Sequence, residues 1–299
     1  MTTTPATPAG TGPARMTVPV AEEVELSVIP AGLDGPLTPV LLVHGLASNA
    51  RLWDGVARHL AASGHPVVSV DQRGHGWSSK PDHGYDFGTV TADLAALVSE
   101  LGWTDRPPMV VGQSWGGNVV LDLAATRPGV AGGITLVDGG TIELAARFAD
   151  WPTAEAALAP PPLIGTPYDN FERMVRAHHP DWPESGIAGS LANMEVLDDG
   201  TIRPWLSREN HMRILRNLWE HRPRQLYPRV DVPVLILMAD DPANPRWMAS
   251  KREEVAAALA GLARSEVHWM EGDHDLHAQY PEEVAGLIHD ATEGIPSPA

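Results

Sequence analysis

The sequence predicts an α/β fold: a mostly parallel sheet flanked by helices on both faces, with a helical cap inserted late in the chain. Short apolar runs alternate with amphipathic stretches from Val40 onward, at the spacing of βαβ units. The alternation stops once, over residues 141–227, and then resumes. We therefore expect one core assembled from residues 16–140 and 228–292, and a cap or lid formed by the insertion.

Length and composition fit this architecture and limit the function. The chain has 299 residues, of which 43% are hydrophobic and 20% charged, enough to bury a full core. A net charge of −17 would repel a phosphate backbone, which argues against a nucleic-acid partner. The absence of cysteine excludes disulfides and thiolate catalysis.

Nothing in the sequence predicts association with a membrane. No apolar run approaches the length of a membrane span, and the first residues lack the apolar segment of a secretory signal. They are rich in Thr, Pro, Ala and Gly, so we expect a cytoplasmic protein with disordered tails at residues 1–15 and 294–299.

The individual elements follow from apolar runs and helix-ending residues. A hairpin at the sheet edge is expected from Met16–Val20 and Val24–Ile29. Buried strands are expected at residues 40–43, 66–70, 109–113, 134–137, 234–237 and 267–270. Helices are expected at residues 52–61, 90–101, 115–123, 171–177, 208–219 and 250–262, and from Pro281 onward.

Ser114 stands at the sharpest turn of the chain. The β-branched run Met109–Val111 is followed by Gly112-Gln113-Ser114-Trp115-Gly116, a G-x-S-x-G motif between a strand and a helix. Such a turn strains the serine backbone and lifts its hydroxyl above the end of the strand. Since the motif also occurs by chance, a plain glycine-rich turn or a phosphate-binding turn remains the alternative.

A serine nucleophile needs a base, and His274 has the right position for one. It lies in the loop Glu271-Gly272-Asp273-His274 after the last strand. His277 follows one helical turn later and fits a supporting role better than that of a base. The spacing of these acidic and histidine residues matches no metal motif, so we expect neither a metal nor another cofactor.

The carboxylate behind the histidine has three candidates. Asp241 is preferred, because it follows the strand at 234–237 and precedes Pro242. Asp240 and Asp138 are the alternatives, and all three satisfy the chain order Ser, Asp, His.

Two backbone N–H groups are expected to form an oxyanion hole. One belongs to Trp115, the residue after the serine, and the other to Leu46, in the loop after the strand at 40–43. Gly45 allows the turn that directs the Leu46 N–H toward the site.

Taken together, these motifs make the chain resemble the α/β-hydrolase superfamily, in particular its lidded esterase, lactonase and peptidase-like members. The matching stretches, in chain order, are Leu42-Val43-His44-Gly45, Asp71-Gln72-Arg73-Gly74-His75-Gly76-Trp77-Ser78, Gly112-Gln113-Ser114-Trp115-Gly116-Gly117, and Gly272-Asp273-His274 with Tyr280-Pro281-Glu282-Glu283-Val284. The resemblance implies Ser114 as nucleophile, His274 as base, and Leu46 and Trp115 as oxyanion donors. The stretch Asp71–Ser78 looks like a structural turn of the family.

The chain departs from the family pattern at the acid. The usual Gly-x-x-Asp is replaced by Met238-Ala239-Asp240-Asp241. Relatives that displace halide or open epoxides often have Asp-Trp at the nucleophile turn, whereas this chain has Ser114-Trp115.

We therefore expect a serine hydrolase of the carboxylesterase or lactonase type, acting on a small-molecule ester or lactone through an acyl-enzyme. The alternatives on the same fold are a C–C bond hydrolase, a hydroxynitrile-type lyase or a cofactor-free oxygenase. A ligand receptor without activity is the alternative from another class.

Overall fold

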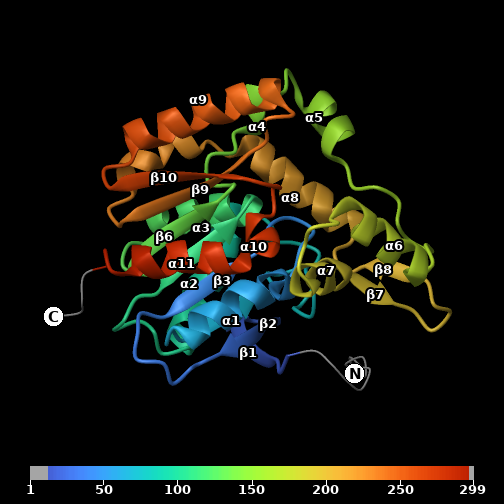
Figure 1. Ribbon diagram of the computed structural model, residues 1–299, viewed down its shortest axis with the longest axis horizontal. Coiled ribbons are helices and arrows are strands. Elements are labelled where there is room, and N and C mark those ends of the chain that lie inside the picture. The colour runs from blue at the N-terminus through green and yellow to red at the C-terminus, as the bar shows by residue number, and fades with distance from the viewer. Residues whose placement is uncertain (1–12, 296–299) are drawn as a thin grey trace.

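An eight-stranded sheet forms the centre of the protein in the computed structural model, which describes residues 13–295 (Figure 1). The strand order is β1-β2-β4-β3-β5-β6-β9-β10. The strands are β1 (Met16–Ala21), β2 (Val24–Ala31), β3 (Val40–Val43), β4 (Val67–Val70), β5 (Met109–Gln113), β6 (Gly133–Val137), β9 (Val234–Asp240) and β10 (Ser265–Glu271). Only the pairs β1–β2 and β2–β4 are antiparallel, so the predicted mostly parallel sheet is confirmed.

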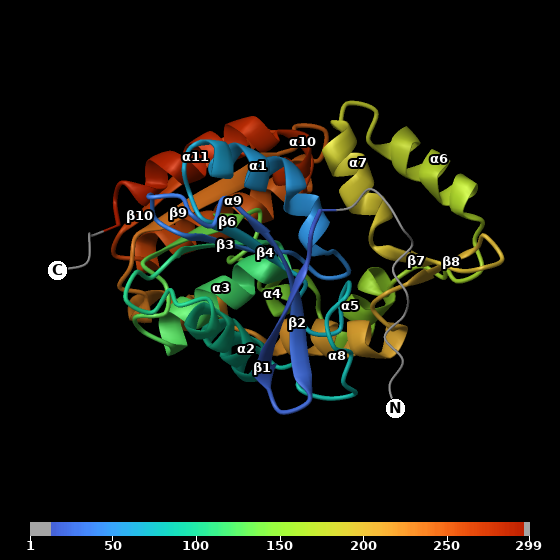
Figure 2. The same cartoon turned by 90° about the horizontal axis from the view of Figure 1, so that it is seen from below.

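Helices cover both faces of this sheet (Figure 2). The helices around the sheet are α1 (Asp54–Ala62), α2 (Phe87–Glu100), α3 (Trp115–Thr126), α9 (Pro245–Gly261), α10 (Leu276–Gln279) and α11 (Pro281–Thr292), with short 3₁₀ turns η1 (Ala50–Trp53), η2 (Pro223–Gln225) and η3 (Tyr227–Arg229). Alternate residues of β3 reach the two layers. Leu41 and Val43 pack in the cluster that contains α2 and α3, whereas Val40 and Leu42 pack in the cluster that contains α1 and α11. The strand is apolar throughout because both of its faces are covered.

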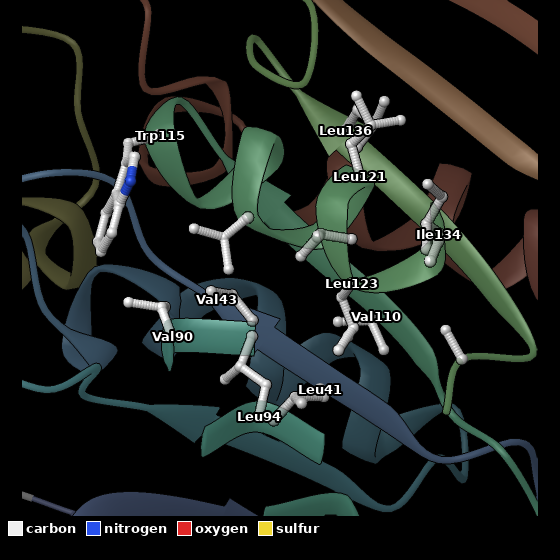
Figure 3. Packing of buried hydrophobic residues seen from close by; sticks show 14 of the residues in the cluster. Leu41, Val43, Val90, Leu94, Val110, Trp115, Leu121, Leu123, Ile134 and Leu136 are labelled. Carbon is white, nitrogen blue, oxygen red and sulfur yellow. The ribbon is translucent and has the colours of Figure 1, made fainter. Parts of the chain in front are cut away.

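The larger of the two clusters includes Trp115, at the start of α3 (Figure 3). It joins Leu41, Val90, Val110 and Leu121 to the buried ring of Trp115, which is the first residue of α3. The packing of α3 on the sheet therefore fixes the position of the residue that precedes it, Ser114.

Between β6 and β9 the chain leaves the sheet and forms an inserted lobe, part of which packs on the core of the sheet (Figure 1). Its elements are α4 (Leu144–Arg147), α5 (Trp151–Leu158), α6 (Tyr168–His178), α7 (Glu184–Leu191), β7 (Met194–Val196), β8 (Ile202–Pro204) and α8 (Arg208–Glu220). The helices predicted at 171–177 and 208–219 correspond to α6 and α8. The inserted segment is largely helical, as predicted, and it also contains a short antiparallel ribbon formed by β7 and β8.

Two elements near the site are longer than expected. Strand β9 continues to Asp240, because β10 pairs with it as far as Glu271 opposite Asp240. Helix α9 begins at Pro245 rather than at residue 250, and a proline is well suited to the first turn of a helix. The loop between β9 and α9 is correspondingly short.

Most of the tail residues predicted to be disordered, 1–12 and 296–299, lie outside the described part of the chain. Arg15 is an exception, since its guanidinium donates to the Asp71 carboxylate at 2.6 Å and to Ser27 Oγ at 2.9 Å. Ile295 likewise packs against the cluster under α11. No helix within residues 13–295 is long and apolar enough to cross a bilayer.

Candidate active site

Ser114 occupies the strained turn that its motif predicts. Its backbone has φ +53° and ψ −123°, outside the regions that a side-chain-bearing residue normally adopts. The strand and helix approach closely there, because a Cβ on Gly112 would lie 2.3 Å from the carbonyl oxygen of Gly116. The Ser114 N–H donates to the carbonyl of Val137 at 3.0 Å, which ties the turn to the end of β6. Strain of this kind, about 1–3 kcal/mol, persists where the surrounding structure enforces it.

Loops from two neighbouring strands press against the serine. A Cβ on Gly45, after β3, would lie 3.0 Å from Ser114 Cβ, and a Cβ on Gly139, after β6, would lie 2.2 Å from the Ser114 carbonyl oxygen. Both loops therefore approach the serine to a distance that only glycine allows. This arrangement surrounds Ser114 with the ends of β3, β5 and β6.

His274 lies in the loop after β10 and contacts a carboxylate. Its Nδ1 is 2.5 Å from Asp138 Oδ2, and its side chain is 52% exposed, whereas that of Asp138 is 3% exposed. The Gln113 side chain donates to the His274 carbonyl at 3.3 Å, which holds the loop beside the residue that precedes Ser114. The imidazole thus has one nitrogen bound to a buried acid, and the ring faces a cavity.

Asp138 has a full set of donors around its carboxylate. Besides His274, the Ala239 N–H donates to Oδ1 at 3.1 Å, and the Lys251 ammonium lies 2.8 Å from Oδ1 and 3.1 Å from Oδ2. Burial by itself would raise the pKa of Asp138, but the hydrogen bond and charge of His274, together with Lys251, outweigh it and lower the pKa. The buried acid is therefore held in its charged form.

The preference for Asp241 as the partner of His274 is corrected by this geometry. Asp241 Oδ1 instead accepts from the N–H of Ala243 at 3.0 Å, within its own loop. The second choice, Asp240, pairs with Arg252 at 3.1 Å. The remaining candidate, Asp138, does contact His274. Since β9 lies between β6 and β10, the Asp138 side chain extends over the end of β9, where it accepts from the Ala239 N–H.

The same contacts set the protonation of His274. Partial desolvation by the surrounding protein would lower its pKa, but the hydrogen bond and the charge of Asp138 outweigh that effect and raise the pKa above 6.5. His277 is the opposite case: burial lowers its pKa to about 3, and its ring packs against Trp53 in a tilted arrangement with 4.1 Å between centroids. Within the described chain neither ring nitrogen of His277 has a hydrogen-bond partner. His277 therefore packs as a neutral aromatic residue.

The two expected oxyanion donors lie beside the serine. Leu46 and Trp115 both line the cavity that contains Ser114. Among residues 13–295, neither backbone N–H donates to a protein acceptor. The loop that presents Leu46 is fixed from behind, because the next N–H, that of Ala47, donates to His75 Nε2 at 3.2 Å. These two N–H groups are thus available to a ligand.

A cavity of about 750 Å³ joins these groups to the inserted lobe. Its wall includes Ser114, Asp138 and His274 from the sheet side, and a largely apolar surface opposite them. That surface is formed by Ile142, Leu144, Leu158, His211, Leu215 and Leu218. Burial lowers the pKa of His211 to about 4, so this histidine is a neutral polar group in an apolar wall at pH 7.

The inserted lobe also contacts the loop that contains His274. Trp182 Nε1 donates to Asp273 Oδ2 at 2.8 Å, and His179 Nδ1 lies 3.2 Å from the same oxygen. The rings of His179 and Trp182 stack at 3.7 Å. The lobe is therefore anchored to the residue immediately before His274.

Sequence reasoning missed Lys251, which is 5% exposed and lines the cavity. The signal was present in the helix pattern: Met248, Lys251, Val255 and Ala258 recur at helical spacing, and all four are buried. A lysine in an apolar stripe needs a charged partner inside the protein. Asp138 is that partner.

Comparison with known proteins places the chain in a family. A sequence profile of the alpha/beta hydrolase family matches residues 40–287. The chain is 33% identical to a haloalkane dehalogenase of Mesorhizobium japonicum over 42% of its own length and 38% of the relative's. It is 35% identical to lipase LipV of Mycobacterium tuberculosis over 47% of its length and 51% of the lipase. These alignments span about half of those relatives or less.

The fold is shared with solved structures over nearly the whole chain. The crystal structure of E-2-(acetamidomethylene)succinate hydrolase superposes with a TM-score of 0.76 at 22% identity, covering 94% of this chain and 99% of that one. The protein belongs to the alpha/beta hydrolase family. Since the named relatives include both a lipase and a dehalogenase, the family alone does not specify the reaction.

Proposed function

We propose that this protein is a serine hydrolase that cleaves small-molecule carboxylic esters or lactones through an acyl-enzyme. The observation that supports it best is the 2.5 Å contact between His274 and the buried Asp138, in the cavity that also contains Ser114 at its strained turn. Serine, histidine and carboxylate are the set that acyl transfer requires. The triad of this proposal is Ser114, His274 and Asp138.

In the first half-reaction, Ser114 Oγ attacks the carbonyl carbon while His274 Nε2 takes the hydroxyl proton. The oxygen of the tetrahedral intermediate accepts from the N–H groups of Leu46 and Trp115. The intermediate collapses when the bond to the leaving oxygen breaks and His274 returns its proton to that oxygen. Asp138 holds the imidazole orientation and stabilises the imidazolium.

In the second half-reaction, water attacks the acyl carbon with His274 again acting as base. The bond to Ser114 Oγ breaks, and the serine recovers its proton from His274. Neither half-reaction of this proposal requires a cofactor.

The inserted lobe, residues 141–227, acts in this proposal as a cap that determines which substrates enter. The apolar wall formed by Leu158, Leu215 and Leu218 supports an apolar acyl or alcohol portion. A cavity of about 750 Å³ is within the range of small-ligand sites. We therefore propose medium-sized, mainly apolar esters as the substrate class.

The decisive test replaces Ser114 by alanine. If the triad acts as a unit, turnover of an aryl ester falls by about 10⁶-fold in Ser114→Ala. The measurement is a chain-length series of p-nitrophenyl esters with a small panel of lactones and amides. Ser63→Ala is the matched control, because Ser63 lies exposed at the end of α1, outside the cavity wall.

Covalent labelling separates acyl transfer from other reactions of the fold. A fluorophosphonate should form a P–O bond to Ser114 Oγ with loss of fluoride, seen as a mass shift on the peptide that contains Ser114. A folded protein that shows no such adduct, or a Ser114→Ala variant that retains ester hydrolysis, would contradict the proposal. Either result would favour a non-acylating reaction or a ligand receptor.

A further inference from the structure

We propose that Lys251 is a positioning residue for the proposed acid–base pair: it fixes the Asp138 carboxylate and balances its charge, so that His274 is available as a base near neutral pH. This inference rests on the proposed function for its catalytic meaning. The coupling of Lys251 to His274 through Asp138 can be measured without any substrate.

The contacts of Lys251 are those of a buried ion pair. Its ammonium lies 2.8 and 3.1 Å from the two oxygens of Asp138, and it donates to the Ala239 carbonyl at 2.9 Å. The side chains of Lys251 and Asp138 are 6% and 3% exposed. Burying an uncompensated charge costs several kcal/mol, so each of these residues requires the other.

Lys251 contacts both oxygens of Asp138 but lies nearer to Oδ1, the oxygen that does not contact His274. His274 Nδ1 lies against Oδ2, whereas the shortest contact of Lys251 and the Ala239 N–H both go to Oδ1. Holding Oδ1 from the side of α9 prevents the carboxylate from rotating away from the imidazole. The Asp138 carboxylate is therefore held in place by two donors, the Ala239 N–H from β9 and the Lys251 ammonium from α9.

The helix that carries Lys251 is itself fixed. One turn further along α9, the buried Glu254 forms a two-point ion pair with Arg147 of α4, in the inserted lobe. The Arg147 guanidinium also stacks on Trp247 of α9 at 4.3 Å. The position of the Lys251 ammonium is thus set by rigid contacts on both sides of the cavity.

The charge of Lys251 opposes that of the imidazolium. Asp138 raises the pKa of His274, and Lys251 acts in the opposite direction. A histidine paired with a buried carboxylate alone would retain its proton to higher pH and would be a base in fewer molecules at neutral pH. Lys251 limits that effect.

Several other charged or titratable groups surround the Asp138–His274 pair and also contribute to the electrostatic field at His274. Asp273 and Asp275 flank His274, and His277 lies one turn further along the chain. Around them are Asp240, paired with Arg252, His179 against Asp273, and Arg147, paired with Glu254. A substitution of Lys251 alone leaves all of these side chains in the sequence.

Lysine is rare in this chain, so a matched control for Lys251 is easy to choose. The sequence contains only two lysines, Lys80 and Lys251, among its 21 basic residues. Lys80 is exposed and donates to the backbone carbonyls of Gly76 and Ser78. Lys80→Met therefore provides a control that removes the same charge far from Asp138.

The test is a histidine NMR titration of the full-length protein, with the His274 signal assigned from His274→Gln. Lys251→Met should raise the pKa of His274 by about one pH unit relative to wild type, because a nearby positive charge has been removed. Lys80→Met should leave it unchanged. A pKa of His274 that is equal to or lower than wild type in Lys251→Met would overturn the inference.

Activity gives the second readout. The acidic limb of kcat/KM for an aryl ester should move to higher pH in Lys251→Met by the same amount as the titration. Lys251→Ala should recover part of the wild-type profile with added n-propylammonium, which replaces the missing atoms and has N–H donors. Equal recovery with tetramethylammonium would contradict the inference, because that ion has no N–H group.

These measurements keep the two proposals apart. If the wild-type protein neither hydrolyses esters nor reacts with a fluorophosphonate, the proposed function fails, and the NMR titration still tests the coupling. If Lys251→Met does not fold, Lys251→Gln keeps an N–H donor without the charge and should also raise the pKa of His274. If the pKa of His274 in a folded Lys251→Gln variant equals that of the wild type, the proposed role of the charge is overturned.

Discussion

The loops after β6 and β9 offer the same chemical group at neighbouring strand ends, yet they treat it in opposite ways. The loop after β6 buries Asp138 and surrounds it with Lys251, His274 and the Ala239 N–H. Strand β9 ends on Asp240, which forms a partly exposed pair with Arg252, and the loop after it turns Asp241 back onto its own backbone. Burial and the supply of donors, not the type of side chain, distinguish a carboxylate that can orient a histidine from one that cannot.

The sheet order explains this difference. Strand β9 lies between β6 and β10, so a side chain from β6 must pass over the end of β9 to reach the loop after β10. Asp138 does so from a backbone with φ +42°, a left-handed conformation that is uncommon for a residue with a side chain. This strained position resembles that of Ser114, and both lie at the same cavity.

The largest effect that tests the comparison is expected from Asp138→Asn. An amide cannot stabilise the imidazolium and favours the wrong tautomer of His274, so kcat for an aryl ester should fall by about 10⁴-fold. Asp241→Asn, the matched change in the other loop, should lower kcat by less than about tenfold. Steady-state kinetics on both variants gives the comparison.

Folding must be checked in that experiment, because Asp138→Asn leaves Lys251 buried without its partner. Removing one member of a buried pair costs about 3–5 kcal/mol. Thermal melts and fluorophosphonate labelling at matched protein concentration show whether the site is intact. Equal losses in the two folded variants, or a larger loss in Asp241→Asn, would reverse the assignment of the acid.

The pH profile gives an effect of intermediate size. In the proposed mechanism His274 acts as a base only when it is neutral, and its pKa is raised above 6.5. The value of kcat/KM should therefore rise with pH to a plateau, with the midpoint of the rise above pH 6.5. Well below the midpoint it should fall about tenfold per pH unit. In Asp138→Asn the midpoint should move down, since the negative partner that favours the imidazolium is gone. A wild-type midpoint at or below 6.5 would argue against the pairing of His274 with Asp138.

The smallest effect is expected in the exposed loop. The Asp240–Arg252 pair is 34% and 58% exposed, so solvent and salt screen it. A double-mutant cycle of Asp240→Asn and Arg252→Gln, measured by urea unfolding, should give a coupling free energy of about 0.5 kcal/mol or less. A coupling of several kcal/mol would show that this loop also holds a structurally essential carboxylate.

Much of the site could be inferred from local sequence. The strand ends that precede Gly45 and Ser114, the loop that contains His274, and the alternation of strands and helices all leave a signature within a few residues. The structure has β3, β5 and β10 within one or two residues of the expected bounds at their ends near the site. Such features are set by backbone conformation and burial, which short-range patterns record well.

The inserted lobe shows where local reasoning fails. Proline and tryptophan content indicated an interruption of the sheet but not the β7–β8 ribbon, nor the contact between Trp182 and Asp273. The Trp182–Asp273 contact joins residues 91 positions apart in the chain, and the ribbon consists of two strands of only three residues each. No periodicity within the segment records them.

Local sequence was enough to predict the sheet, the turn at Ser114, the loop of His274 and the loop that presents Leu46, because each depends on a strand and the few residues after it. Neither the aspartate that meets His274 nor the lysine that meets that aspartate could be chosen without knowledge of the fold. Those choices depend on the order of β6, β9 and β10 and on the packing of α9 against the inserted lobe. A carboxylate acquires its role from the donors that the fold brings to it, and these come from distant parts of the chain.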